Sequence, residues 1–499
     1  MDPRLAAIRD FQGTYPRQLW WLFLSEMWER FCFYGMRGVL TVFMIQKLLM
    51  DEQQANLQYG GIQAFVYTMT FVGGFFADKI LGFRKSITWG GILMVVGSFT
   101  VAAGIMISDA PKDMFFLGTS ISIVGTGFFK PNISGVVGLL YNDGDPRRNA
   151  GFGLFYSGIN LGAALGGYLC VMLGKSIGWE WAFIAAGIAM IFGVGVFTMT
   201  KNTLGPLGFS PLVPEGQTPS PQARNKILMT YGGSLLSIPL ILLLVSNSEY
   251  TDYFMYTVGP LALAYFLWDM RTCTRVEVQK LFAALVFIVF SIFFWAFFEQ
   301  SGGSLAIVAE NHVQGTSIAG FGVDPIEVNN TSNSIFVIVL SPLLGLVWLW
   351  MKKAEPNTVV KFGLGFLFLA GGFWLFHSLI HFIGADGRSS LAIFTLAWMV
   401  TTIGELCLSP IGLSAMTRLA PKRMFGIIMG LWFLASAYGQ YLAGILGAGM
   451  ANIEANATAA EKLQGYTDGY LQLTIYAVVL GVLLIVISPL VKKLMHDER

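Results

Sequence analysis

Seven ionisable residues lie within stretches of this chain that are otherwise apolar. They are four acids and three bases: Glu26, Glu29, Arg30, Arg37, Lys130, Glu299 and Glu405. A charge in the hydrocarbon core of a membrane is costly, so residues of this kind commonly line a polar path or carry protons. The set therefore predicts a transporter, with carboxylates as proton carriers because a dry environment makes them easier to protonate near neutral pH.

The densest of these groupings is a stripe along one predicted helix. The stripe holds Glu26, Arg30, Phe33 and Arg37, flanked by Glu29 and Tyr34. At about 100° per residue, its four members fall within roughly 60° of one another. The structural alternative is a neutralised ion cluster that only fixes helix packing. Buried ion pairs stabilise poorly compared with apolar packing, so the stripe favours a functional role.

Three further charged residues stand alone on apolar segments. Lys130 lies in mid-span before Pro131, which removes a backbone donor and permits a kink. Glu299 is near the outer end of its span, as is Arg37, so we predict an Arg37–Glu299 outer gate that opens when Glu299 is protonated. Glu405 begins a second polar stretch on an apolar helix.

Composition excludes an ordinary soluble enzyme. Charged residues make up 12% of the 499 residues and hydrophobic residues 55%, whereas soluble domains carry about 25% charge. Spans of roughly 20 apolar residues recur along the chain. We expect fourteen of them, at 18–49, 57–77, 86–107, 114–140, 150–173, 181–200, 227–247, 253–270, 281–299, 334–351, 362–383, 390–417, 424–450 and 469–491.

The distribution of lysine and arginine predicts the orientation. If the amino terminus is cytoplasmic and every span crosses once, 23 of the 31 Lys and Arg residues lie on the cytoplasmic side and three within spans. The other side holds five, namely Lys47, Lys112, Lys175, Arg388 and Lys462. This asymmetry obeys the positive-inside rule and predicts that both termini are cytoplasmic.

The polar breaks divide the spans into six, two and six. We predict a six-helix bundle at 1–200, a proline-rich cytoplasmic linker at 201–226, two accessory transmembrane helices at 227–276 and a second six-helix bundle at 277–499. The fold class is then an all-α membrane protein with the major facilitator fold, in which the substrate site lies between two halves near the membrane midplane. Residues 302–333 are expected to form a polar outer loop.

Four motifs, in order, resemble those of the proton-dependent oligopeptide transporters (POT family) of the major facilitator superfamily. They are Glu26-Met-Trp-Glu29-Arg30-Phe31, the loop 73–84 with Asp78-Lys79, the segment 125–134 with Lys130-Pro131-Asn132, and Phe294-Trp295 through Glu299-Gln300. The likeness continues through 405–421. Phe33 and Lys79 depart from the family pattern, which often has a tyrosine and an arginine there.

The resemblance implies a symporter that imports di- and tripeptides by alternating access, driven by inward proton flow. Proton coupling and gating would fall to Glu26, Glu29, Arg30, Arg37, Lys130 and Glu299. Substrate binding would fall to Arg37 and Lys130 at the peptide carboxylate, to Asn160, Asn333 and Glu405 at the amino terminus, and to Tyr34, Tyr67, Trp295, Trp432 and Ser436 around the side chains.

Two other functions remain open at this point. One is proton-coupled transport of another small anion or metabolite, such as nitrate, on the same fold; the other is a non-transporting nutrient receptor. An enzyme is disfavoured, because the spans contain no nucleophile–base pair or metal cluster. We expect no cofactor other than the coupling proton, no nucleic acid and no obligate protein partner, and a location in a bacterial inner membrane.

Overall fold

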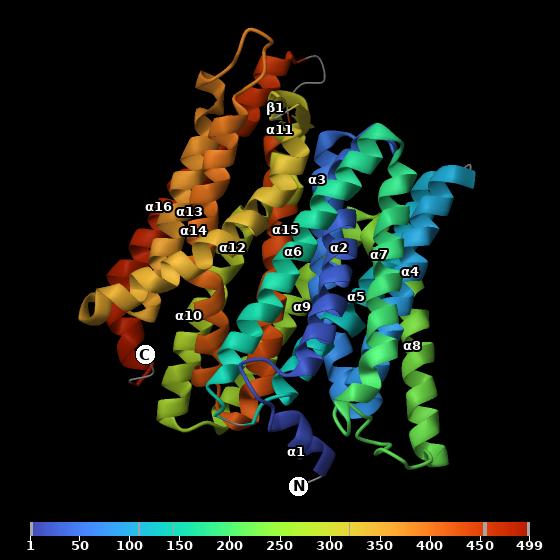
Figure 1. The fold of residues 1–499 in the computed structure, drawn as a ribbon. Coiled ribbons are helices and arrows are strands. Elements are labelled where there is room, and N and C mark those ends of the chain that lie inside the picture. The colour runs from blue at the N-terminus through green and yellow to red at the C-terminus, as the bar shows by residue number, and fades with distance from the viewer. Residues whose placement is uncertain (1–2, 108–109, 143, 319, 453–456, 497–499) are drawn as a thin grey trace. The chain divides into compact units, whose positions relative to one another are not determined.

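The protein is almost entirely helical. The computed structural model describes residues 3–107, 110–142, 144–318, 320–452 and 457–496 (Figure 1). Its long helices are α2 (Arg17–Gln46), α3 (Glu52–Phe76), α4 (Phe83–Ile107), α5 (Pro111–Leu139), α6 (Arg147–Ser176), α7 (Trp179–Thr200), α8 (Pro221–Ser246), α9 (Ser248–Asp269), α10 (Arg275–Phe298), α12 (Pro325–Met351), α13 (Thr358–Ser378), α14 (Leu391–Leu419), α15 (Phe425–Met450) and α16 (Ala459–Leu494).

These long helices follow the predicted spans in order. Eleven helical segments of the described chain are long and apolar enough to cross a membrane. The three long helices not among them are α2, which carries the ionic stripe, α5, which carries Lys130, and α9. The shorter elements are α1 (Pro3–Arg9), α11 (Ser304–His312), the strands β1 (Thr316–Ile318) and β2 (Phe321–Val323), and single turns η1 (Ala77–Leu81), η2 (Lys201–Leu204), η3 (Met270–Thr272), η4 (Glu299–Gly302), η5 (Lys352–Ala354), η6 (Leu379–His381) and η7 (Lys422–Met424).

The prediction of an outer loop over 302–333 was wrong for most of that segment. The segment contains α11, an antiparallel β1–β2 pair and the first turns of α12. Helix α12 begins at Pro325 because Asp324 and Glu327 form a capping box, and α16 begins at Ala459 because Thr458 and Glu461 form another. Capping boxes satisfy the first backbone donors of a helix with polar side chains, so helices begin before their apolar stretches do.

The chain forms two compact units. Unit 1 comprises residues 1–40 and 65–247, and unit 2 comprises residues 41–64 and 248–499. The two predicted accessory helices separate, since α8 belongs to unit 1 and α9 to unit 2. The predicted domain boundaries at 200, 226 and 276 stay predictions.

Unit 1 is packed through close backbone contacts at glycine. A Cβ added to Gly90 would lie 2.5 Å from the carbonyl oxygen of Gly125, and one added to Gly97 would lie 2.5 Å from that of Gly118. Helices α4 and α5 therefore touch backbone to backbone, as small residues permit in membranes. Helix α8 packs along α5, and its Ser234 Oγ accepts a hydrogen bond from Trp89 Nε1 of α4 at 3.0 Å.

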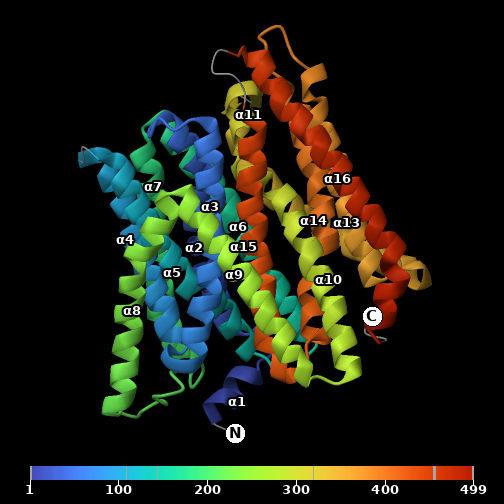
Figure 2. The same ribbon diagram turned by 180° about the vertical axis from the view of Figure 1, so that it is seen from behind.

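Unit 2 includes the turn that joins α2 to α3. Thr41 Oγ1 donates a hydrogen bond to the carbonyl of Gly302, and Tyr466 OH donates to Glu52 Oε2 at 2.6 Å. Helix α9 runs beside α15 (Figure 2), where Tyr441 OH donates to Asp252 Oδ1 at 2.5 Å. Polar bonds thus anchor this accessory helix to unit 2.

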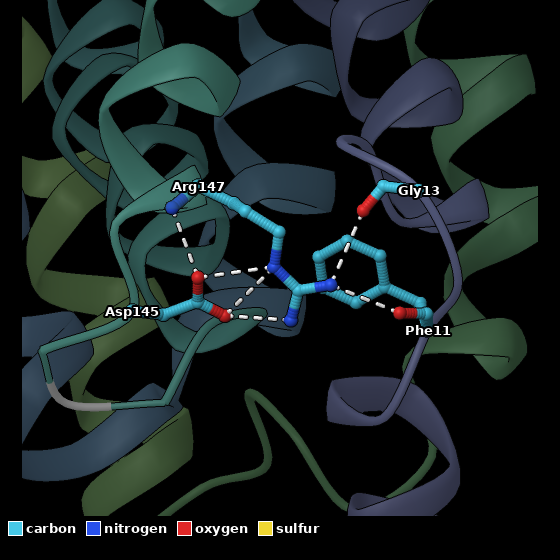
Figure 3. Close-up of polar contacts among 4 residues, drawn as sticks. All are labelled: Phe11, Gly13, Asp145 and Arg147. Atoms are coloured by element: carbon cyan, nitrogen blue, oxygen red, sulfur yellow. Dashed lines mark hydrogen bonds and ion pairs between the residues drawn. The ribbon is translucent and has the colours of Figure 1, made fainter.

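Arginine side chains tie the amino-terminal segment to one end of unit 1. Arg9 donates hydrogen bonds to the carbonyl of Leu139, and Arg147 reaches back to the segment from α6. Arg147 makes a bidentate ion pair with Asp145 and donates hydrogen bonds to the carbonyls of Phe11 and Gly13 (Figure 3). Its guanidinium also lies 3.9 Å from the centroid of the Phe11 ring. These hydrogen bonds from Arg147 hold the pKa of Asp145 below its usual range, so the pair is charged at neutral pH.

We predict that Arg147→Ala lowers the melting temperature of the detergent-purified protein and makes the segment before α2 more sensitive to protease. The reason is that one substitution removes an ion pair, two hydrogen bonds and a cation–π contact. Arg148→Ala is the matched control. Arg148 is the next residue in the chain, and its side chain makes a cation–π contact with Phe152 but no ion pair or hydrogen bond with any described residue. Equal effects of the two substitutions would contradict the assignment.

Candidate transport site

The centre of the candidate site is an ion cluster on one turn of α2. Arg30 Nε lies 2.9 Å from Glu26 Oε1 and 2.5 Å from Glu29 Oε2. All three side chains are at most 2% exposed. The spacing of four residues places Glu26 and Arg30 on the same face, as the stripe predicted.

The geometry of this cluster leaves carboxyl oxygen atoms without hydrogen bonds. Glu26 Oε2 and Glu29 Oε1 are buried without a hydrogen-bond partner in the described part of the chain. Buried polar atoms are nearly always hydrogen-bonded, so such an exception calls for a functional or chemical explanation. A carboxyl oxygen with no donor facing it is a place where a proton can bind.

Lys130 of α5 joins this cluster from a second helix. Its ammonium lies 4.3 Å from the centroid of Tyr67 and 5.5 Å from that of Phe33, and it is within electrostatic range of both Glu26 and Glu29. The lysine therefore has acids for charge neutralisation and two aromatic faces for contact.

Arg37 lies two helical turns beyond Arg30 on α2. Its guanidinium is 5.6 Å from the centroid of Tyr34, and both side chains are partly exposed whereas the acids are buried. The part of the candidate site in unit 1 thus contains three bases, Arg30, Arg37 and Lys130, and two acids, Glu26 and Glu29. This excess positive charge suits the binding of a single carboxylate.

Glycines on α6 allow that helix to lie directly against the ion cluster. A Cβ on Gly162 would meet the carbonyl oxygen of Met27 at 2.1 Å and the Cβ of Arg30 at 2.9 Å. Gly158 and Gly166, each four residues from Gly162, make similar contacts with α2, so this four-residue glycine spacing serves helix packing. Asn160, one of the predicted binding residues, donates to the carbonyl of Tyr156 on its own helix.

Unit 2 contains a separate carboxylate with its own partners. Asn333 Nδ2 of α12 donates to Glu405 Oε2 of α14 at 2.7 Å and lies 3.3 Å from Thr402 Oγ1. Glu405 is buried. The structure thus brings together Asn333 and Glu405, the two unit 2 residues predicted to receive a peptide amino terminus.

The remaining predicted residues of unit 2 lie on α10 and α15. Trp295 packs edge-on against Phe294 and Phe298, and Trp432 is buried against Gly412. Ser436 Oγ donates to the carbonyl of Trp432 at 3.4 Å. Glu299 is buried at the end of α10; it belongs to unit 2 and Arg37 to unit 1, so their gate contact stays a prediction.

Sequence reasoning did not identify two contributors to these sites. Thr402 lies beside the Asn333 amide, and Gly162 gives α6 its access to α2. Phe33 was placed in the stripe by its spacing, but its contact with Lys130 of α5 was not predicted. Thr402 carries no spacing signal. For Gly162 the signal was present in the four-residue glycine spacing, but it indicated packing and not which helix was the partner.

Comparison with known proteins decides the family. A profile of the POT family (PTR2) matches residues 84–463. The chain belongs to the POT family. The peptide transporter YePEPT of Yersinia enterocolitica is 30% identical, with 98% of this chain and 97% of that protein aligned. The di-/tripeptide transporter of Lactococcus lactis subsp. cremoris is 31% identical, with 97% of each aligned.

Solved structures of this POT family agree in fold. A crystal structure of a peptide transporter POT in complex with sulfate has a TM-score of 0.82 and 31% identity, covering 99% of each chain. A POT family transporter in complex with 5-aminolevulinic acid has a TM-score of 0.80 and 27% identity, covering 97% of this chain and 98% of that one. The predicted major facilitator fold is confirmed, and the protein is a multi-pass integral membrane protein.

We predict that Gly162→Ala destabilises the protein and impairs transport. The added methyl group would collide with the α2 backbone beside Arg30, and overpacking of this kind costs about 1–3 kcal/mol. Gly153→Ala on the same helix is the control, since a Cβ there meets nothing within 4 Å and replacing a helical glycine normally stabilises by roughly 0.5–1 kcal/mol. Thermal unfolding and peptide uptake of both variants test this, and a neutral Gly162→Ala would refute it.

Proposed function

We propose that this protein is a symporter that couples inward proton flow to the import of di- and tripeptides by alternating access. The observation that carries the proposal is the buried Glu26–Arg30–Glu29 cluster with its unsatisfied carboxyl oxygens. Membership of the POT family, and the peptide transport in the names of its relatives, support it.

Coupling follows from charge balance within unit 1. Protonation of Glu26 or Glu29 removes a negative charge from the cluster and leaves Arg30 and Lys130 with more positive charge than acid to neutralise it. A peptide carboxylate near Arg37 and Lys130 restores the balance. Each ligand therefore strengthens the binding of the other, which is the reciprocity that thermodynamic linkage requires.

The two ends of a peptide carry opposite charges and would need different partners. The carboxylate suits the excess positive charge of Arg37 and Lys130 in unit 1, and the ammonium suits Glu405 in unit 2, which Asn333 already orients. Tyr34, Tyr67, Trp295, Trp432 and Ser436 would surround the peptide side chains, with Asn160 near the amino terminus.

The membrane placement is also a proposal. The lysine and arginine distribution favours an orientation with both termini in the cytoplasm, and the bacterial origin of the relatives favours a bacterial inner membrane. Glu299 and Arg37 would form the outer gate. Neither a nucleic acid nor an obligate protein partner is needed for this mechanism, and protons are the only coupling ion it requires.

A second candidate cargo is a small zwitterionic metabolite. A POT family transporter 27% identical to this chain binds 5-aminolevulinic acid, which carries an amine and a carboxylate at opposite ends. The same charge arrangement would therefore accept it. Uptake of labelled dialanine in the presence of unlabelled 5-aminolevulinic acid tests this candidate. Inhibition of uptake would indicate a shared site, and no inhibition would indicate a site that accepts only peptides.

We predict that Glu29→Gln abolishes proton-driven uptake of labelled dialanine in proteoliposomes, with a loss of tenfold or more, but preserves counterflow exchange. The amide cannot release a proton, whereas exchange of one peptide for another needs no net proton movement. Glu355→Gln is the control, because this exposed glutamate pairs only with Lys361 among the described ion pairs. Loss of both transport modes would contradict a coupling role, and no wild-type uptake would contradict peptide transport.

We predict that Glu405→Ala weakens dialanine binding roughly 10- to 100-fold, the range expected when a hydrogen bond to a charged group is lost. Isothermal titration of the purified protein provides the measurement. N-acetyl-dialanine, which lacks the ammonium, should bind the wild type weakly and be insensitive to the substitution. Equal weakening for both compounds would show that Glu405 does not receive the amine.

A further inference from the structure

Helix α8 leaves a crevice where it packs against the rest of unit 1. The cavity has a volume of about 610 Å³ and lies between α8, α5 and the end of α3 with η1. Its apolar lining includes Met69, Val72, Phe76, Phe128 and Met229. Figure 1 shows α8 in green. The proposed transport cycle assigns no role to either accessory helix, α8 or α9.

The polar atoms of the crevice wall are already occupied. Thr230 Oγ1 donates to the carbonyl of Lys226, and Ser237 Oγ to that of Ser234, both within α8. Ser234 Oγ donates to the carbonyl of Tyr231 and accepts from Trp89. Because these hydroxyls already form hydrogen bonds within the protein, they do not need a polar ligand. The interior of the crevice is therefore suited to a hydrocarbon chain.

Two consecutive glycines in α8 have no packing explanation. A Cβ on either Gly232 or Gly233 would meet nothing within 4 Å, although glycine within a helix costs roughly 0.5–1 kcal/mol relative to alanine. Gly233 lines the crevice and Gly232 does not. The missing side chain at Gly233 keeps the crevice open where no protein group fills it.

Two lysines complete the lining at one end. Lys79 of η1 and Lys226, in the second turn of α8, are both exposed and both line the crevice. Neither ammonium forms an ion pair with any residue that the structure describes. The acid beside them is Asp78, which is exposed and outside the lining. An apolar crevice with two bases at its end is complementary to a molecule with a hydrocarbon tail and an anionic head.

We propose that this crevice binds an anionic phospholipid, with an acyl chain against Gly233 and Met229 and the phosphate facing Lys79 and Lys226. Basic pockets between transmembrane helices on the cytoplasmic side bind anionic headgroups. Both lysines lie on the side of the membrane that we propose to be cytoplasmic. The lipid fastens α8 to unit 1, and this role does not depend on the peptide being the cargo.

Native mass spectrometry of the detergent-purified full chain tests the site. Phosphatidylglycerol is titrated against phosphatidylcholine with the same acyl chains, and inorganic phosphate is the headgroup-only probe. Wild type should retain one phosphatidylglycerol in preference to phosphatidylcholine. The double variant Lys79→Gln/Lys226→Gln should bind it roughly 25-fold more weakly, from about 1 kcal/mol per basic residue converted at 1.4 kcal/mol per tenfold.

Matched variants separate the site from general effects. Gly233→Leu should displace the lipid and Gly232→Leu should not, although both add the same side chain to the same helix. Lys492→Gln/Lys493→Gln removes two exposed charges from unit 2 and should leave binding unchanged. Melting temperatures confirm that each variant is folded. Equal retention of the two lipids, saturation by inorganic phosphate, or equal effects of the two leucine substitutions would each overturn the proposal.

Discussion

The structure depends on how charge is accommodated in an apolar environment. An ionised side chain removed from water needs a partner of opposite charge, a hydrogen-bond network or a proton. Arg30 meets this need by contacting two carboxylates at once, and Lys130 by lying near those acids and over an aromatic ring. The arrangement nevertheless leaves carboxyl oxygens of Glu26 and Glu29 without a hydrogen-bond donor among the described residues. That imbalance makes it responsive to protons and to an arriving carboxylate.

Glycine makes this arrangement possible in unit 1. Arg30 and its acids occupy one turn of α2, and α6 can lie beside that turn only because Gly162 has no side chain. Close helix contact in a membrane normally gains van der Waals energy. Here it also excludes lipid and water from the ion cluster, which keeps the electrostatic coupling strong.

The two units carry complementary chemistry. In unit 1, the bases of the candidate site outnumber its acids by one. In unit 2, the site contains the hydrogen-bonded Glu405–Asn333 pair. The accessory helices follow the division as well, since α8 is bonded to unit 1 through Ser234 and α9 to unit 2 through Asp252.

The sequence by itself determined the long helices, the ionic stripe and the family. These depend on local composition and on spacing along one helix, as for Glu26, Arg30 and Arg37, and a helical period converts spacing directly into shared faces. The tertiary structure decided which helices meet. The contacts of Lys130 with Phe33 and Tyr67, of Asn333 with Glu405 and Thr402, and of Gly162 with Met27 join residues far apart in the chain. It also decided that α12 and α16 start early at polar caps. Hydropathy reports only the energy of leaving water, whereas these features depend on the packing and hydrogen-bond geometry of the folded chain.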